Sequence, residues 1–172
     1  MQPREDPDEP TVELLAVDED VLDRLVAAAV AGASANEVTP PVSPGEEWMP
    51  ERIGWLRDFH RSRRAGLDGP AREATWAVVA DGDVVGSIRM RRIADSDNVD
   101  VGLWLTRGVR GGGVGRRAVA AVLGEARALG ATAVRADTTA NNGPALAVLA
   151  ALGFECTAVE DDGVIAWLAL EG

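Results

Sequence analysis

The stretch VRGGGVGRRAVAAVLGEARALG, residues 109–130, decides the fold. Glycine occupies four of the five positions 111–115, and an alanine-rich apolar stretch follows. Clustered glycine removes side chains, so that another group can approach the main chain closely. The apolar residues after the glycines recur at helical spacing, which predicts a helix over about 114–129.

The start of this expected helix is suited to an anion. The first N–H groups of a helix have no partner inside it, and the helix dipole favours negative charge there. Arg110, Arg116 and Arg117 add positive charge around the glycines. The stretch therefore predicts a loop that binds phosphate or pyrophosphate, in preference to a purely structural turn.

Working outward, periodicity and turn residues predict the order β-α-α-β-β-β-α-β-α-β-β. Asp18 is expected to cap the first helix, and Asp81-Gly82 and Asp162-Gly163 to turn two hairpins. The segment 32–47 reads as a loop, because it holds three prolines and no periodicity. The expected elements are strands at 11–17, 97–106 and 131–139, hairpins within 74–94 and 156–170, and helices at 18–33, 50–66, 114–129 and 143–153.

This order predicts the α/β class. The expected sheet is mixed, mostly antiparallel and flanked by helices, with one βαβ crossover. With 172 residues the chain is long enough for one domain, which we expect over 11–172 after a disordered or loosely attached tail, 1–10.

Composition limits the function. The net charge of −11 argues against nucleic acid or an anionic membrane as a partner and is compatible with a cationic small molecule. There is no transmembrane-length apolar run and no signal peptide at the acidic start, so we expect a cytoplasmic protein. One cysteine, Cys156, and one histidine, His60, exclude an internal disulfide and a histidine-rich metal site, and we expect no metal. We expect Cys156 to be buried and His60 to lie at the surface.

Three kinds of phosphate-binding loop must be compared. A P-loop needs a lysine, and the chain has none. Residues 113–118 spell G-x-G-x-x-A, the dinucleotide fingerprint, with Asp137 about twenty residues later. However, seven residues separate Leu105 from Gly113, and antiparallel strands precede the loop, so an NAD(P)-binding protein is a weaker hypothesis.

The third kind fits better. Residues 110–115, R-G-G-G-V-G, resemble the R/Q-x-x-G-x-G/A motif of the GNAT acetyltransferase superfamily. The segment NGPALAVLAALGF, residues 142–154, is similar to a second segment of that family, and a hydrophobic strand precedes the first motif at the same place. The resemblance covers 74–155 well and implies an acyl-CoA N-acyltransferase fold.

The resemblance implies acetyl-CoA as co-substrate. The loop would hold its pyrophosphate, mostly through backbone N–H groups, the end of the central strand would pair with pantetheine as an added strand, and Asn142 would bond to the same arm. A bulge in that strand would free an N–H to stabilise the oxyanion. Asn142 is also a candidate cap of the helix that follows. The implied cofactor-binding residues are Leu103, Trp104, Leu105, Arg110, Gly111, Gly112, Gly113, Val114, Gly115, Arg116 and Asn142.

The catalytic groups are less well marked. Asp137 stands where some family members carry a catalytic glutamate, and Asp100 and Asp97 are alternatives. The family's usual general acid, a tyrosine seven residues after the asparagine, is Leu149 here, and the chain contains no tyrosine. Since a thiol has a pKa near about 8.5, its thiolate can leave unprotonated or with the help of water.

The acceptor side carries Trp48 and Trp55 beside several acids, so both are candidate substrate-binding residues for a cation. The leading hypothesis is an N-acetyltransferase acting on a primary amine of a small molecule by direct attack, and a protein or peptide N-terminus is the second choice. A non-catalytic acyl-CoA-binding module is the alternative class, and a homodimer is possible.

Overall fold

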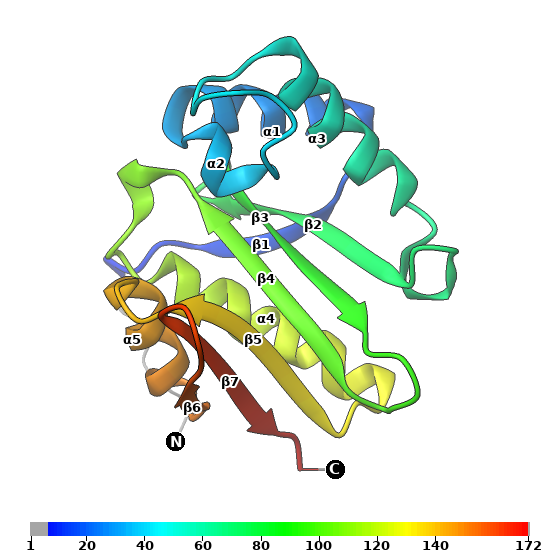
Figure 1. Cartoon of the computed structure of the whole chain (residues 1–172), viewed down its shortest axis with the longest axis vertical. Coiled ribbons are helices and arrows are strands. Elements are labelled where there is room, and N and C mark those ends of the chain that lie inside the picture. The colour runs from blue at the N-terminus through cyan, green and yellow to red at the C-terminus, as the bar shows by residue number, and fades with distance from the viewer. Residues whose placement is uncertain (1–6, 172) are drawn as a thin grey trace.

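One seven-stranded sheet forms the centre of the computed structural model, which describes residues 7–171 (Figure 1). Its strand order is β1-β2-β3-β4-β5-β7-β6. All neighbours are antiparallel except β4 and β5, which are parallel and joined by the crossover helix α4. The strands are β1 (Val12–Ala16), β2 (Glu73–Ala80), β3 (Asp83–Arg92), β4 (Val99–Leu105), β5 (Ala133–Thr139), β6 (Glu155–Ala158) and β7 (Gly163–Ala169). The predicted class and the single βαβ crossover are confirmed.

Helices cover the two faces of the sheet differently. In Figure 1, α4 lies behind β4 and β5, while α1, α2 and α3 lie over the other end of the sheet, and the front of β4, β5 and β7 is left without a helix. The helices are α1 (Glu19–Gly32), α2 (Ala35–Val38), α3 (Pro50–Ser62), α4 (Val114–Leu129) and α5 (Gly143–Ala151), with 3-10 turns η1 (Gly66–Asp68) and η2 (Arg107–Val109).

The core has two clusters, one on each face. Val101 and Val134 pack with Val122 of α4 in the larger cluster. Leu25 of α1 and Ala77 of β2 belong to the smaller one. Side chains alternate between faces along a strand, so a strand's odd and even positions face different helices.

Local sequence signals predict several element ends correctly. The Asp18 carboxylate accepts the N–H of Val21 at 2.8 Å and caps α1. Helix α4 begins at Val114 and ends at Leu129 as predicted, with Gly130 in the left-handed conformation after it, at φ 84°. Asp81 and Gly82 both have positive φ and turn the β2–β3 hairpin, as their sequence indicates.

Two expectations near the second helix are wrong. The predicted loop 32–47 contains the short helix α2, which begins with a capping box between Ser34 and Glu37. The S-x-x-E spacing carries this signal. Helix α3 ends at Ser62 rather than at Gly66, and a 3-10 turn begins at Gly66.

At the N-terminus, residues 1–6 of the predicted tail lie outside the described residues. Within the remaining part, the Glu9 carboxylate forms ion pairs with Arg117 and, at 4.0 Å, with Arg116. The end of the predicted tail is therefore held at the start of α4. The single domain expected over 11–172 stays a prediction.

Strands β4 and β5 separate part-way along their length. Their register covers only Val99–Val101 against Val134–Ala136. Beyond these residues each strand pairs on its other side alone, β4 with β3 to Leu105 and β5 with β7 to Thr139. This leaves an opening in the sheet at the carboxyl ends of two neighbouring parallel strands.

Candidate active site

The edge of β4 that faces this opening has free backbone groups. Thr106 N–H donates to Val85 O of β3, so by the alternation of an antiparallel ladder the N–H groups of Leu103 and Leu105 point away from β3, toward the opening. The β3–β4 register is unbroken from Gly86–Leu105 to Arg92–Val99. The bulge expected in this strand is therefore absent. The departure of β5 frees the N–H groups instead.

The glycine loop lies directly beyond this edge. Gly113 caps α4 at φ 85° and Gly111 has φ 83°, conformations that side chains rarely adopt. A Cβ at either position would meet nothing within 4 Å, so the approach is open. The first helical bond in the turn runs from Arg117 N–H to Gly113 O, which leaves the N–H groups of Val114, Gly115 and Arg116 to an outside partner. The loop geometry fits a pyrophosphate.

Arg110 bonds to the end of β4 and to α2. Its Nε and Nη2 donate to Leu105 O at 3.2 and 2.9 Å, and its Nη1 and Nη2 contact Glu37 of α2 at 3.4 and 3.3 Å. The Ser34 N–H, followed by the Arg110 guanidinium, lowers the pKa of Glu37. The side chain thus ties the end of β4 and the loop to α2, and its contact with the cofactor stays a prediction.

Helix α5 closes the other side of the opening. The Asn142 side chain accepts Ala145 N–H at 3.2 Å and caps α5, so its capping role is confirmed while its bond to pantetheine stays a prediction. A Cβ on Gly115 would lie 3.5 to 3.7 Å from Leu105, Val148 and Leu103, so α4, α5 and the end of β4 pack together here. Leu149, at the usual tyrosine position, is buried in the larger core cluster.

The sheet face turned away from α4 carries a chain of paired charges. Glu73, which is buried, accepts from Arg63 at 2.8 Å and from Arg89 at 3.3 Å. Asp100, also buried, accepts from Arg89 at 3.1 Å and from Arg91 at 2.9 Å. Because both guanidinium groups bond to the same oxygen of Asp100, this carboxylate is engaged in the fold and is a poor candidate for a catalytic base.

The other two predicted catalytic acids lie in different places. Asp137 is the first residue of β5 past its pairing with β4, and its carboxylate takes two bonds from Arg135, at 3.0 and 3.1 Å. Its side chain is 55% exposed at the opening. Asp97 precedes β4 at the strand's other end, roughly 20 Å from Leu103 at the rise of an extended strand. The structure brings Asp137 to the opening and leaves Asp97 away from it.

The inner face of α3 holds two polar side chains. Arg52 and His60 are buried, whereas Ile53 and Phe59 are half-buried. His60 Nδ1 lies 2.9 Å from Thr75 Oγ1 of β2. Burial, with the nearby Arg63 guanidinium as the second cause, lowers the pKa of His60 to about 4. The expectation of a surface histidine is wrong, because Thr75 supplies a partner that compensates its burial.

The two candidate substrate-binding tryptophans pack against the smaller core cluster. The Trp48 indole N–H donates to Ala33 O at 2.9 Å, which ties the α2–α3 segment to the end of α1. Trp55 stacks on Phe59 at 5.1 Å, and Arg63 lies over the same ring at 4.1 Å. Their contact with a substrate stays a prediction.

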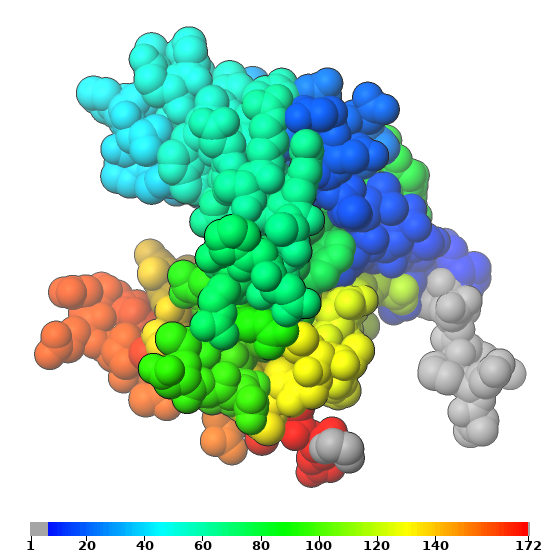
Figure 2. Space-filling view, turned by 90° about the vertical axis from the view of Figure 1, so that its right-hand side faces the viewer, coloured from blue at the N-terminus to red at the C-terminus, as the bar shows by residue number. Residues whose placement is uncertain are grey.

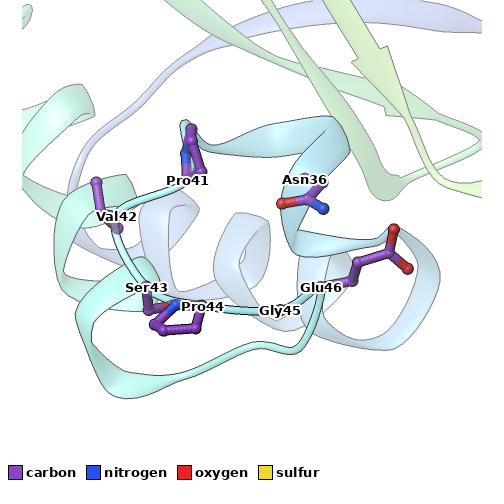
Figure 3. A pocket seen from close by; sticks show the side chains of 7 residues that line it. All are labelled: Asn36, Pro41, Val42, Ser43, Pro44, Gly45 and Glu46. Atoms are coloured by element: carbon purple, nitrogen blue, oxygen red, sulfur yellow. The ribbon is translucent and has the colours of Figure 1, made fainter.

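Two hollows mark the surface near these elements. The first is the open pocket of Figure 3, lined by Asn36 of α2 and by residues 41–46, and Arg52 holds that segment by donating to Ser43 O at 3.0 Å and to Gly45 O. In Figure 2 the molecule is also indented between the α2–α3 segment (cyan) and the segment near α5 and β6 (orange). This indentation is on the side that faces the viewer in Figure 1, where β4 and β5 separate.

Cys156 lies exposed on the edge strand β6, so the expectation of a buried cysteine is wrong. Among residues 7–171, no group of three or more His, Cys, Asp or Glu residues is arranged to hold a metal ion. In the same range, no helix is long and apolar enough to cross a membrane.

Comparison with known proteins agrees with this geometry. Residues 13–155 match the family model described as an acetyltransferase (GNAT) domain. No curated protein matches the chain.

Several solved structures are similar to this fold. RimJ from Mycobacterium smegmatis, solved with a CoA disulfide, is 19% identical with a TM-score of 0.74 over 92% of this chain and 81% of its own. The self-immunity acetyltransferase MccE, in complex with acetyl-CoA and AMP, is 13% identical with a TM-score of 0.71, covering 95% and 93%. RimL, a ribosomal alpha-N-protein acetyltransferase in complex with coenzyme A, is 15% identical with a TM-score of 0.69, covering 93% and 94%.

Proposed function

Because this chain belongs to the GNAT acetyltransferase family, we propose that it transfers the acetyl group of acetyl-CoA to a primary amine of a small molecule. The observation that carries the proposal is the opening between β4 and β5, which ends at the glycine loop and leaves the inward N–H groups of β4 without a strand partner. The similar structures of MccE and RimL hold acetyl-CoA and coenzyme A.

In this proposal the pyrophosphate binds to the N–H groups at the start of α4 and to Arg116 and Arg117. Pantetheine lies along β4 as an added strand, with Leu103 and Leu105 as backbone partners and Asn142 on the α5 side. An N–H of β4 faces the thioester oxygen and stabilises the negative charge that develops on it.

The amine enters from the face opposite α4, where Asp137 stands at the opening. Asp137, directly or through water, takes one proton from the ammonium, which gives the nitrogen the lone pair needed for attack. The nitrogen then attacks the acetyl carbonyl carbon, a C–N bond forms, the C–S bond breaks and the second proton passes to solvent. The exposed Arg135–Asp137 pair is worth little in free energy, under about 1 kcal/mol, so an incoming ammonium can displace it.

The leaving thiolate has no protein acid at the family's usual position, because Leu149 is buried and apolar. Its proton comes from solvent through the indentation in Figure 2. A thiolate is a tolerable leaving group near neutral pH, so a missing tyrosine does not by itself disfavour catalysis.

The first experiment is calorimetric titration of the purified chain with acetyl-CoA, CoA and NAD(P) in parallel. Micromolar binding of acetyl-CoA, reduced about 100-fold in Gly113→Val, is expected, because a β-branched residue is strained at positive φ and its side chain narrows the phosphate approach. Gly124→Val, in the exposed middle of the same helix, is the matched control. Binding of NAD(P) without CoA would overturn the proposal.

Turnover is measured next, as thiol release with a panel of amines. Binding of acetyl-CoA without acetylation of any amine or N-terminal peptide would favour a non-catalytic acyl-CoA-binding module. Transfer to peptides alone would favour a protein N-acetyltransferase, the activity named for RimL. A homodimer, a cytoplasmic location and the absence of a metal requirement stay predictions.

A further inference from the structure

One edge of the Arg89 guanidinium is unused by the fold. Its Nη1 donates to Glu73 and to Asp100. Within residues 7–171, its Nε and Nη2 form no hydrogen bond. Nε–H and one Nη2–H point in the same direction, so this edge offers two parallel donors, the arrangement that matches the two oxygens of a carboxylate.

Gly102 determines where this edge lies. Arg89 and Gly102 are partners in the β3–β4 register, and a Cβ on residue 102 would lie 2.8 Å from Nε and 2.9 Å from Nη2. The guanidinium therefore lies against the β4 backbone. This position is one residue beyond Val101, the last β4 residue paired with β5, and so it is at the opening.

On this face the carboxylates of Glu73 and Asp100 are held in buried ion pairs, whereas Arg89 remains partly accessible. Glu73 and Asp100 side chains are 4% and 8% exposed, whereas the Arg89 side chain is 33% exposed. The ion-paired side chains of this face near the opening carry a small positive excess in a chain of net charge −11. The excess is one charge, from Arg63, Arg89, Arg91 and Arg135 against Glu73, Asp100 and Asp137.

We propose that the acceptor is a primary amine that also carries a carboxylate, and that Arg89 binds this carboxylate through Nε and Nη2. The inference rests on the proposed acetyl transfer and names the class of its acceptor. Asp137 lies on the same face across the opening from Arg89, so the ammonium and carboxylate ends of one small molecule each face the opposite charge. A free amino acid carries both groups, whereas the N-terminus of a protein lacks the α-carboxylate.

The test compares kcat/KM for matched pairs of amines. L-amino acids are compared with their carboxamides, and ethanolamine phosphate with ethanolamine, in the wild type and in Arg89→Gln, Gly102→Ala and Arg57→Gln. Arg57 pairs with Asp23 between α3 and α1 and controls for loss of an exposed arginine. We expect the wild type to prefer the carboxylate about tenfold or more, as a charge-assisted bidentate contact implies.

Arg89→Gln is expected to reduce this preference to about twofold or less, because the anion contact is lost, and the carboxamides, which do not use that contact, are the reference within each variant. Gly102→Ala should weaken the preference in the same direction, since its Cβ displaces the guanidinium without removing its charge. Glu73 keeps Arg63 and Asp100 keeps Arg91 in Arg89→Gln, and thermal unfolding checks that the variant folds.

Equal kcat/KM for acids and carboxamides, or a preference that survives both variants, overturns the inference. A preference for ethanolamine phosphate alone also overturns it and assigns the donors to a phosphate. If acetyl-CoA binds but no amine is acetylated, the proposed function fails by itself. The inference is then decided by thermal shift with L-amino acids on the CoA-loaded protein, where stabilisation of the wild type but not of Arg89→Gln supports it and no stabilisation overturns it.

Discussion

The two faces of the central sheet come from the same alternation of residues, yet different interactions hold them. Toward α4, β4 and β5 present Val99, Val101, Val134 and Ala136, all buried in one apolar cluster. On the opposite face, the alternate positions present Asp100, Gly102, Arg135 and Asp137; Asp100 pairs with two arginines of β3, and Arg135 pairs with Asp137 along β5. Burial of apolar area stabilises the first face, and specific ion pairs stabilise the second. Each face is therefore sensitive to a different kind of change.

The sharpest way to separate the faces is to remove the exposed carboxylate of Asp137 at the opening. Asp137→Asn is expected to lower kcat about 100-fold or more, as loss of a general base does, while leaving the Kd of acetyl-CoA unchanged. Steady-state kinetics and calorimetry on the same protein check both quantities. Asp97→Asn, at the far end of β4, is the matched control and should be neutral. Equal loss in both variants would remove Asp137 from the proposed reaction.

Substitutions at two neighbouring residues of β4 show how much each face contributes to the free energy of unfolding. Val101→Ala creates a cavity against α4, and Asp100→Asn removes the carboxylate that Arg89 and Arg91 share. Each is expected to lower the free energy of unfolding by about 2 kcal/mol, the first by lost packing and the second by unpaired charge on arginines that are partly solvated. Urea unfolding measures both.

Only one of these two losses should depend on salt. At 1 M NaCl the Debye length falls to about 3 Å. The loss in free energy of unfolding caused by Asp100→Asn should therefore shrink, while the loss caused by Val101→Ala should persist. If both losses depend equally on salt, the ion pairs make no separate contribution to the stability of the charged face.

His60 gives the charged face a pH dependence that the apolar face lacks. Its pKa is about 4 in the fold against 6.5 in the unfolded chain, so the unfolded state binds the proton first as the pH falls. The free energy of unfolding should therefore fall as the pH drops from 6.5 toward 4, by about 2 kcal/mol between pH 6.5 and 5, where carboxylates stay mostly ionised. His60→Gln should be nearly flat over this interval in urea unfolding. A wild type that is equally flat would contradict the burial of a neutral imidazole.

The same comparison explains what could be predicted from the sequence. Helix α4, with glycine at both ends, and the Asp81-Gly82 hairpin depend on neighbours in the chain, so their residues predict them directly. The glycine loop, the most local part of the site, was predicted for the same reason.

The charged face depends on partners that are distant in sequence. Arg110 contacts Glu37 from 73 positions away, and His60 is buried because Thr75 stands opposite it on β2. From the sequence alone, a polar residue on a helix is predicted to be exposed unless such a partner is known. For that reason His60 was expected at the surface, and Asp100 was taken as a candidate catalytic residue. Only the fold shows that its charge is already neutralised.

The smallest expected effect concerns the N-terminal segment, where a charge pair reaches the apolar side of the sheet. Glu9 pairs with Arg116 and Arg117 at the start of α4, so its carboxylate competes for groups assigned to the pyrophosphate. Because the pair is exposed, Glu9→Gln should tighten acetyl-CoA binding only about two- to fourfold at low salt, and less as salt rises. Glu125→Gln, farther along α4, removes the same charge and controls for the change in net charge. Calorimetry at two salt concentrations decides the matter, since equal tightening in both variants would mean that overall charge, and not this contact, limits binding.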